Sequence, residues 1–271
     1  MDDDKLIEEA ARLISGAGRL VAFSGAGVSE ESGIPTFRDP GGLWDRYNPS
    51  EIGSGDIFAE ALSGSPIPDA TFQFVSEFIS CFEKTGPNPG HEALGRLEEM
   101  GILRAVITQN IDNLHREAGN SNVIEVHGNV YRLACMMCGN RVVLDRDEFL
   151  CAGRDLIECL GKNDLAGLIK LASRCNCGGV CRLDVVNFGE PVQDLPRAVL
   201  EAKNCDLMLI LGTSGVVWPA ATLPGHAKKA GAKLVEINAT DCCFPDITDV
   251  GIVGKTGEIL PRIVELVRGM R

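Results

Sequence analysis

Short apolar runs alternate along this chain with stretches in which apolar residues recur at helical spacing. Apolar side chains from Leu6 to Leu13 follow the period of an amphipathic helix, and the continuous run from Leu20 to Phe23 predicts a short buried strand. Further strands are predicted at residues 105–108, 123–126, 206–211 and 233–237, with helical stretches such as 220–230 between them. This alternation predicts an α/β fold in which helices cover both faces of a parallel sheet.

Two segments interrupt the alternation. Residues 39–89 are rich in Gly, Pro and Ser and turn helical from 70 to 82, which predicts a loop followed by a helical module. Residues 131–184 hold most of the cysteines, and 145–173 within them have a helical pattern. We therefore expect one large α/β domain with two smaller parts inserted into it.

Charge and cysteine content narrow the possible functions. Acidic residues outnumber basic ones by 38 to 26, and the net charge of −12 repels phosphate backbones, which disfavours direct nucleic-acid binding. The apolar runs are far shorter than the ~20 residues that cross a bilayer. The acidic start from Met1 to Lys5 is unlike a signal peptide, so we expect a cytoplasmic protein without a membrane partner. Eleven cysteines then indicate metal binding or free thiols rather than disulfides.

A glycine turn follows the first predicted strand directly. Its residues are Gly25-Ala26-Gly27-Val28-Ser29, and the sequence continues through Thr36, Phe37 and Arg38. A strand that runs into such a turn is typical of dinucleotide-binding units, because glycine lets the backbone approach a pyrophosphate closely. An ordinary tight turn is the alternative interpretation. The third glycine of the hydride-transfer fingerprint is replaced by Glu30.

A polar cluster follows the predicted strand at 105–108. Gln109, Asn110 and Asp112 can hydrogen-bond ribose hydroxyls and a carboxamide, and ligands of open α/β sheets bind at this edge. A polar capping loop would have the same composition.

His127 lies between a predicted strand and Gly128. An imidazole that titrates near neutrality can accept a hydroxyl proton, so His127 is the candidate general base. The alternative is a structural histidine.

Four cysteines form two closely spaced pairs. Cys135-Met136-Met137-Cys138 precedes a glycine, as in a zinc knuckle, and Cys175-Asn176-Cys177 is a shortened second pair. We predict a structural zinc site; Cys181 could replace a member of the second pair. A redox pair or unrelated thiols are the alternatives. We interpret five others as ordinary thiols: Cys151, Cys159, Cys205, Cys242 and Cys243.

Together these motifs resemble those of the sirtuins. Further matching segments are 184–190, 212–214 and 235–238, so the resemblance runs from Leu20 to Ile263. It implies a Rossmann-like, doubly wound NAD-binding domain (1–38, 90–130 and 185–271), a cofactor-binding loop with a helical module (39–89) and a small zinc-binding domain (131–184). The implied activity is NAD-dependent deacetylation of acylated lysine in proteins, which yields nicotinamide, free lysine and O-acetyl-ADP-ribose.

The resemblance also implies the roles of individual residues. Catalysis rests on His127 and Asn110. NAD is held by Gly25, Ala26, Gly27, Thr36, Phe37, Arg38, Gln109, Asn110, Ile111, Asp112, Gly212, Thr213, Ser214, Asn238 and Thr256. The substrate backbone pairs as an added strand with Val185, Val186, Phe188, Gly189 and Glu190. Zinc is bound by Cys135, Cys138, Cys175 and Cys177.

Three features depart from the usual pattern of the family or distinguish its members. Glu30 places a charge near the expected pyrophosphate site unless its side chain points to solvent, and Leu183 stands where proline is common. Sirtuins that favour dicarboxylic acyl groups carry a Tyr and an Arg at positions that correspond here to Val75 and Phe78. We therefore expect an apolar acyl pocket suited to acetyl, with longer fatty acyl groups left open.

Three alternative functions share parts of this pattern. A protein mono-ADP-ribosyltransferase would use the same cofactor site with another acceptor. A non-catalytic module that binds NAD or acyl-lysine would fit if Glu30 and the shortened cysteine pair prevented turnover, although Asn110 and His127 argue against it. A Rossmann dehydrogenase conflicts with the broken glycine fingerprint and the cysteine segment.

Overall fold

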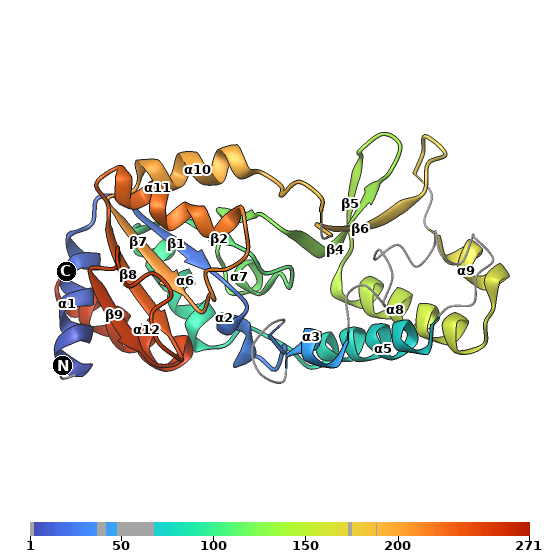
Figure 1. The fold of residues 1–271 in the computed structure, drawn as a ribbon, viewed down its shortest axis with the longest axis horizontal. Helices are drawn as coiled ribbons and strands as arrows, with labels where there is room; N and C mark the ends of the chain where they lie inside the picture. Colours follow the sequence, from blue (N-terminus) through green and yellow to red (C-terminus); the bar gives the residue numbers. More distant parts are fainter. Residues whose placement is uncertain (1–2, 37–41, 48–67, 173–174, 188) are drawn as a thin grey trace. The chain divides into compact units, whose positions relative to one another are not determined.

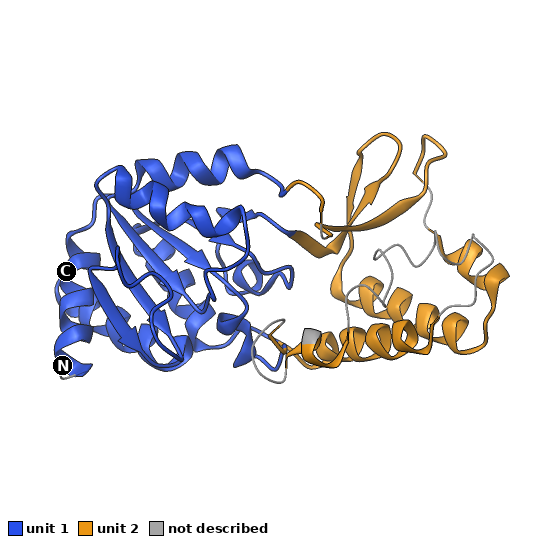
Figure 2. Ribbon diagram, viewed as in Figure 1, with its two compact units in different colours: residues 1–34, 86–127, 192–271 blue, residues 35–85, 128–191 orange. Residues whose placement is uncertain are grey.

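The computed structural model describes residues 3–36, 42–47, 68–172, 175–187 and 189–271. The chain divides into two compact units (Figure 2). Unit 1 comprises residues 1–34, 86–127 and 192–271, and unit 2 comprises residues 35–85 and 128–191. Among the helices of the described residues, none is both long and apolar enough to cross a membrane.

Unit 1 is built on a six-stranded parallel sheet with the order β3-β2-β1-β7-β8-β9 (Figure 1). The strands are β1 (Leu20–Ser24), β2 (Leu103–Thr108), β3 (Val123–Glu125), β7 (Leu207–Leu211), β8 (Lys233–Asn238) and β9 (Val250–Val253). The strand order extends from β1 in one direction and then from β7 in the other. The two halves therefore meet between β1 and β7, the switch point at which doubly wound sheets bind ligands. The predicted fold class is confirmed.

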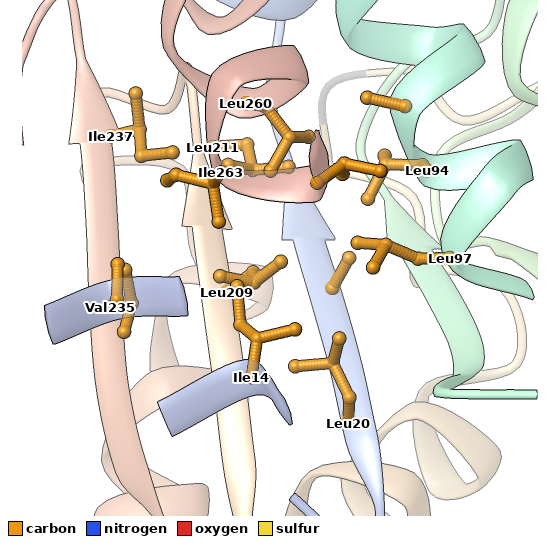
Figure 3. Packing of buried hydrophobic residues seen from close by; sticks show 14 of the residues in the cluster. Ile14, Leu20, Leu94, Leu97, Leu209, Leu211, Val235, Ile237, Leu260 and Ile263 are labelled. Atoms are coloured by element: carbon orange, nitrogen blue, oxygen red, sulfur yellow. The ribbon is translucent and has the colours of Figure 1, made fainter. Parts of the chain in front are cut away.

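Helices cover both faces of this sheet. They are α1 (Asp3–Gly16), α2 (Gly27–Glu30), α6 (Pro89–Glu99), α7 (Leu114–Glu117), α10 (Leu195–Asn204), the 3-10 turn η1 (Ala220–Thr222), α11 (Leu223–Lys229) and α12 (Thr256–Gly269). On one face, Ile14, Leu97 and Ile263 from α1, α6 and α12 pack against strand residues such as Leu209 (Figure 3). On the other face, α10, η1 and α11 supply a second apolar cluster. Every residue of β1 and β7 is buried, as their continuously apolar sequences predict.

Unit 2 contains a three-stranded antiparallel sheet with the order β5-β4-β6. Its strands are β4 (Gly128–Cys135), β5 (Arg141–Val143) and β6 (Cys181–Val185), and its helices are α3 (Leu43–Arg46), α5 (Asp69–Glu83), α8 (Arg146–Gly161) and α9 (Leu165–Leu171). Aromatic rings form its centre, where Phe82 contacts both Tyr131 and Phe149 edge to face. The helical pattern predicted for 145–173 is present as α8 and α9.

Candidate active site

The glycine turn after β1 lies against the end of β7. Gly25 and Gly27 donate backbone hydrogen bonds to Leu211 and Gly212, at 2.9 and 2.8 Å. A Cβ atom added to Gly25 would lie 2.7 Å from the Gly212 oxygen, and one added to Gly212 would lie 2.5 Å from the nitrogen of Val28. These glycines are therefore required by the close approach of two backbone segments at the switch point. The sequence pattern explained these glycines only by a bound pyrophosphate, whereas their contacts with Gly212 and Val28 require them without any ligand.

Glu30 is exposed in this turn, so its charge faces solvent. The neighbouring Glu31 accepts a hydrogen bond of 2.8 Å from the backbone nitrogen of Gly257, near the start of α12. The departure at position 30 therefore places no carboxylate inside the site.

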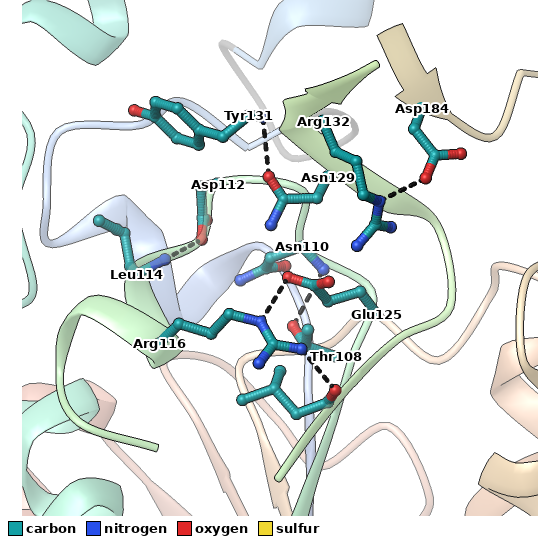
Figure 4. Close-up of polar contacts among 11 residues, drawn as sticks. Thr108, Asn110, Asp112, Leu114, Arg116, Glu125, Asn129, Tyr131, Arg132 and Asp184 are labelled. Atoms are coloured by element: carbon teal, nitrogen blue, oxygen red, sulfur yellow. Dashed lines mark hydrogen bonds and ion pairs between the residues drawn. The ribbon is translucent and has the colours of Figure 1, made fainter. Parts of the chain in front are cut away.

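A buried hydrogen-bonded network joins the glycine turn to the polar cluster after β2. Ser29 Oγ donates to Asp112 Oδ2 at 2.6 Å, and Asn110 Nδ2 donates to Ser29 Oγ and to the Gly25 oxygen, both at 3.0 Å. Because both amide hydrogens of Asn110 are used in this way, its oxygen is the group that it can offer to a ligand. Burial raises the pKa of Asp112, while hydrogen bonds from Ser29 and Leu114 oppose that rise. Figure 4 shows the contact between Asp112 and Leu114.

Two buried histidines extend the network. His91 Nδ1 accepts a hydrogen bond from the Asn88 nitrogen at 3.4 Å, so its Nε2 carries the hydrogen and faces Ser29 Oγ at 3.5 Å. His115 Nε2 lies 2.8 Å from Ser24 Oγ, and the centroids of the two imidazole rings are 4.8 Å apart. Burial lowers the pKa of His91 to about 4 and that of His115 well below its usual value. Both rings are therefore neutral at neutral pH.

The candidate base His127 follows β3 and is half-buried. Its Nδ1 lies 3.0 Å from the backbone oxygen of Gln109. A carbonyl oxygen can only accept, so Nδ1 carries the hydrogen and Nε2 retains a lone pair. Burial lowers the pKa of His127, and the hydrogen bond to Gln109 offsets part of that effect. The imidazole is thus neutral, oriented and able to accept a proton at Nε2.

A second polar group lies at the ends of β7 and β8. Asn238 accepts a hydrogen bond from the Thr213 nitrogen at 3.0 Å and donates one to the Thr213 oxygen at 3.2 Å. Gln109 Nε2 donates to Thr213 Oγ1 at 2.9 Å, which links this group to the end of β2. Thr256 is buried at the first position of α12, whereas Ser214 is exposed.

Unit 1 therefore brings most of the predicted cofactor residues to the carboxyl edge of one sheet. They are Gly25, Ala26, Gly27, Gln109, Asn110, Ile111, Asp112, Gly212, Thr213, Ser214 and Asn238, with Thr256 at the start of α12. The amide oxygen of Asn110 and the polar groups around Thr213 suit a ligand rich in hydroxyl and amide groups, as NAD is. Sequence reasoning missed the roles of Ser29 and His91 in this network.

The other predicted site residues belong to unit 2 or are not described. Three lie outside the described residues: Phe37, Arg38 and Phe188. The members of the predicted substrate segment that are described, Val185, Val186, Gly189 and Glu190, lie at the end of β6 and in the turn after it. Glu190 stabilises that turn by accepting hydrogen bonds from Arg182 at 2.8 Å and from the Asn187 nitrogen at 3.0 Å. Thr36 is buried.

The four predicted metal ligands converge in unit 2. The sulfur atoms of Cys135, Cys138, Cys175 and Cys177 all lie within 4.8 Å of one another. A tetrahedral zinc site with Zn–S bonds of ~2.3 Å needs sulfur atoms roughly 3.8 Å apart, so these residues fit the ion. Backbone amides of Cys138 and Met137 lower the pKa of Cys135 to about 6, which favours the thiolate form that binds metal.

Cys181 is not a member of this cluster. It is buried opposite Cys135 in the pairing of β4 with β6, and burial raises the pKa of its thiol. The shortened pair at 175–177 reaches the other two sulfur atoms without it.

Comparison with known proteins agrees with this arrangement. The model of the Sir2 family matches residues 25–219. An NAD-dependent protein deacylase of Desulfosudis oleivorans is 47% identical over 272 residues, which cover 100% of this chain and 99% of that protein.

Solved structures lead to the same family. A structure that addresses the mechanism and regulation of Sir2 enzymes has a TM-score of 0.77 at 40% identity, covering 99% of this chain and 100% of that one. A Sir2 protein solved with a p53 peptide and NAD+ has a TM-score of 0.73 at 32% identity, covering 98% and 99%. With most of its length matched by sequence and by fold, the chain belongs to the Sir2 family.

Proposed function

We propose that this protein is an NAD-dependent protein lysine deacylase that removes acetyl groups from lysine side chains. The observation that carries the proposal is the state of His127, whose Nδ1 is bound to the Gln109 oxygen at 3.0 Å and whose Nε2 is free to accept a proton. This base lies in the same unit as the buried network of Asn110 and Asp112. The 47% identity to a protein named as an NAD-dependent deacylase supports the same reaction.

Residues of unit 1 have separate roles in the reaction. When NAD is bound, it supplies the ADP-ribose that accepts the acyl group as nicotinamide leaves. His127 takes up a hydroxyl proton at Nε2, which makes that oxygen a better nucleophile. Asn110 presents its amide oxygen, and Ser29 and Asp112 hold that amide in place. One molecule of water from solvent is consumed, and the products are nicotinamide, free lysine and O-acetyl-ADP-ribose.

The cofactor contacts follow the groups at the sheet edge. NAD is bound by the polar and glycine residues of this edge, which are 25–27, 109–112, 212–214, Asn238 and Thr256. Thr36, Phe37 and Arg38 complete the cofactor site. Residues 185, 186 and 188–190 pair with the backbone of the acylated peptide. The four cysteines bind one structural zinc ion, which holds the two turns that carry them.

The charge of the protein bears on its partners, and its thiols bear on its location. A net charge of −12 favours lysine-rich protein segments over nucleic acid. We place the protein in the cytoplasm, because its cysteines are arranged as a candidate zinc site and separate thiols rather than as a disulfide framework.

An assay of both products tests the proposed function. The wild-type protein is incubated with NAD and an acetyl-lysine peptide, and nicotinamide and O-acetyl-ADP-ribose are quantified together. Deacylation requires equal amounts of the two. Nicotinamide without the acetylated sugar would establish ADP-ribosyl transfer or NAD hydrolysis instead, and release of neither product with any acyl peptide would establish a binding module.

The acyl preference is a separate prediction based on α5. Val75 is buried. The ring of Phe78 stacks on Phe74 with centroids 5.8 Å apart and contacts Phe82 edge to face with centroids 5.0 Å apart. Neither position carries a cation or a phenol, so a carboxylate on the acyl chain would lose its hydration without an ionic partner there. We expect kcat/KM for a succinyl-lysine peptide to be at least about 100-fold below that for the acetyl peptide.

A butyryl-lysine peptide is the matched control, because it has the chain length of succinyl without the charge. It should react clearly faster than the succinyl peptide, because its added methylenes cost no charge desolvation and each changes binding by only about 1–3 kcal/mol. Succinyl removal at the acetyl rate would contradict the prediction.

A further inference from the structure

Glu236 is a completely buried carboxylate on β8, two residues before Asn238. Its Oε1 accepts hydrogen bonds from Asn238 Nδ2 at 2.7 Å and from the Cys243 nitrogen at 2.5 Å. Its Oε2 accepts from the Phe244 nitrogen at 3.3 Å and from Thr248 Oγ1 at 2.9 Å. All four donors are uncharged. A carboxylate buried without such donors would be strongly destabilising, so these contacts fix where the side chain lies.

The carboxylate helps to fix which way the Asn238 amide faces. With Nδ2 directed at Glu236, the oxygen of Asn238 points to the Thr213 nitrogen and accepts its hydrogen bond at 3.0 Å. The reversed amide would set its oxygen against the carboxylate and its NH2 group against the Thr213 N–H. Both contacts would be repulsive. The negative charge at position 236 therefore reinforces the orientation of Asn238 that the Thr213 N–H and C=O also favour, and its 2.7 Å contact is the shortest of the three.

The same carboxylate holds the loop between β8 and β9 against the loop after β7. Cys243, whose nitrogen binds Glu236, directs its sulfur to the Thr213 oxygen at 3.0 Å. Gly215 has a positive φ of 67°, and a Cβ atom added there would lie 3.0 Å from the Phe244 ring. Two loops at the carboxyl edge of the sheet thus pack on each other around one buried charge.

We propose that Glu236 is a positioning residue for the nucleotide part of NAD. It contacts neither cofactor nor substrate, but it sets the geometry of Asn238 and Thr213, which bind the cofactor in the proposed function on which this inference rests. Gln109 connects Thr213 to His127 through hydrogen bonds of 2.9 and 3.0 Å. The expected effect nevertheless falls on NAD affinity. Gln109 binds His127 through its backbone oxygen, and that backbone is held by a hydrogen bond of 3.0 Å from the Gln109 nitrogen to the Ser24 oxygen.

The test is Glu236→Gln, which keeps the length of the side chain and replaces one acceptor oxygen with a donor NH2 group. KM for NAD should rise about tenfold, as expected for the loss of a hydrogen bond to a charged group. The kcat and the KM for the acetyl peptide should change by less than about twofold. A merely structural role would lower the amount of folded enzyme or its Tm without changing KM for NAD, and that result would overturn the proposal.

Asp249→Asn is the matched control. Asp249 also anchors the connection of β8 with β9, but at the opposite end of β8, where it accepts from the Leu234 nitrogen, Lys228 and Lys233. This change should lower Tm and leave KM for NAD unchanged; an equal rise in KM would overturn the positioning role of Glu236. If Glu236→Gln does not fold, Thr248→Val removes a single donor to Oε2 and should raise KM for NAD by about two- to threefold.

Equilibrium titration of each variant with NAD alone separates this proposal from the proposed function. If the wild-type protein binds NAD and Glu236→Gln binds it equally well, only the positioning role fails. If the wild-type protein does not bind NAD, the proposed function fails and the positioning role fails with it. If the wild-type protein binds NAD and Glu236→Gln binds it more weakly, both the proposed function and the positioning role are supported.

Discussion

Replacing His127 with alanine is expected to lower kcat for deacylation by a factor of about 10²–10⁴, the usual contribution of a positioned general base. The reason is the single lone pair at Nε2, which remains because Nδ1 donates to Gln109. Formation of O-acetyl-ADP-ribose should be lost to this extent. Nicotinamide release should fall less, because His127 is not proposed to act on nicotinamide. Both products are measured in one assay with an acetyl-lysine peptide.

His226→Ala is the matched control for this substitution. His226 lies on α11 (Leu223–Lys229), a helix that supplies none of the proposed catalytic or cofactor-binding residues. We expect its replacement to leave the rate unchanged. If His127→Ala kept more than about a tenth of the wild-type kcat, a group other than His127 would have to be the base.

The lowered pKa of His127 also predicts how the rate of deacylation depends on pH. The base acts as neutral imidazole, so activity is present above its pKa and is lost as the pH falls through it. Burial lowers that pKa below the usual 6.5, and the acid limb of kcat/KM should therefore have its midpoint below 6.5. His91, with a pKa of about 4, titrates at the acid end of that range. A midpoint above 6.5 would contradict the assigned environment of His127.

The stability of the folded protein should also decrease as the pH falls. A buried histidine with a depressed pKa favours the folded state while it is neutral, so its contribution is complete above 6.5 and decreases as the pH falls toward the folded-state pKa. Tm measured from pH 8 to pH 4 should therefore begin to fall below about 6.5. Rates are to be taken on enzyme that remains folded at each pH.

The sheet of unit 1 was predictable because burial on both faces leaves a simple sequence pattern. The apolar run at 20–23 became β1 (Leu20–Ser24), and 206–211 became β7 (Leu207–Leu211). The helix predicted at 220–230 begins instead as a 3-10 turn, and α11 starts only at Leu223. Pro224 explains the boundary, because its missing N–H is tolerated in the first turn of a helix but not inside one.

The buried network could not be predicted in the same way. His91 and Ser29 lie on α6 and α2, 62 residues apart, and they meet only because both helices adjoin the turn after β1. Asn88 caps the start of α6 and Pro89 follows it, which places His91 in the first turn, but no local sequence pattern shows what that turn contacts. Glu236 is a similar case. A charged residue within an apolar strand predicts a side chain that faces solvent, and only the structure shows the four hydrogen-bond donors that hold it buried.

Removing zinc is expected to unfold the small sheet of unit 2 and abolish deacylation. The sheet has only three strands, and all residues of β5 are exposed, so apolar burial contributes little to the part of the sheet formed by β5. The metal would join the turn at 135–138 to the turn at 175–178, and closed thiolate sites contribute apparent binding energies on the order of 10 kcal/mol that are coupled to folding. Treatment with a chelator should therefore remove one zinc ion per chain, reduce the sheet signal in circular dichroism and stop turnover. Added zinc should restore all three.

Single substitutions distinguish the ligands of the zinc ion from the neighbouring thiol. Cys177→Ala should lose the metal and the activity, because three thiolates leave the tetrahedral site open. Cys181→Ala removes a buried thiol that faces Cys135 across the strands but lies outside the cluster, so zinc content should stay at one per chain with only a small loss of Tm. Loss of zinc from Cys181→Ala but not from Cys177→Ala would show that Cys181 replaces the shortened pair. Full activity of Cys177→Ala without metal would instead show that unit 2 folds without the ion.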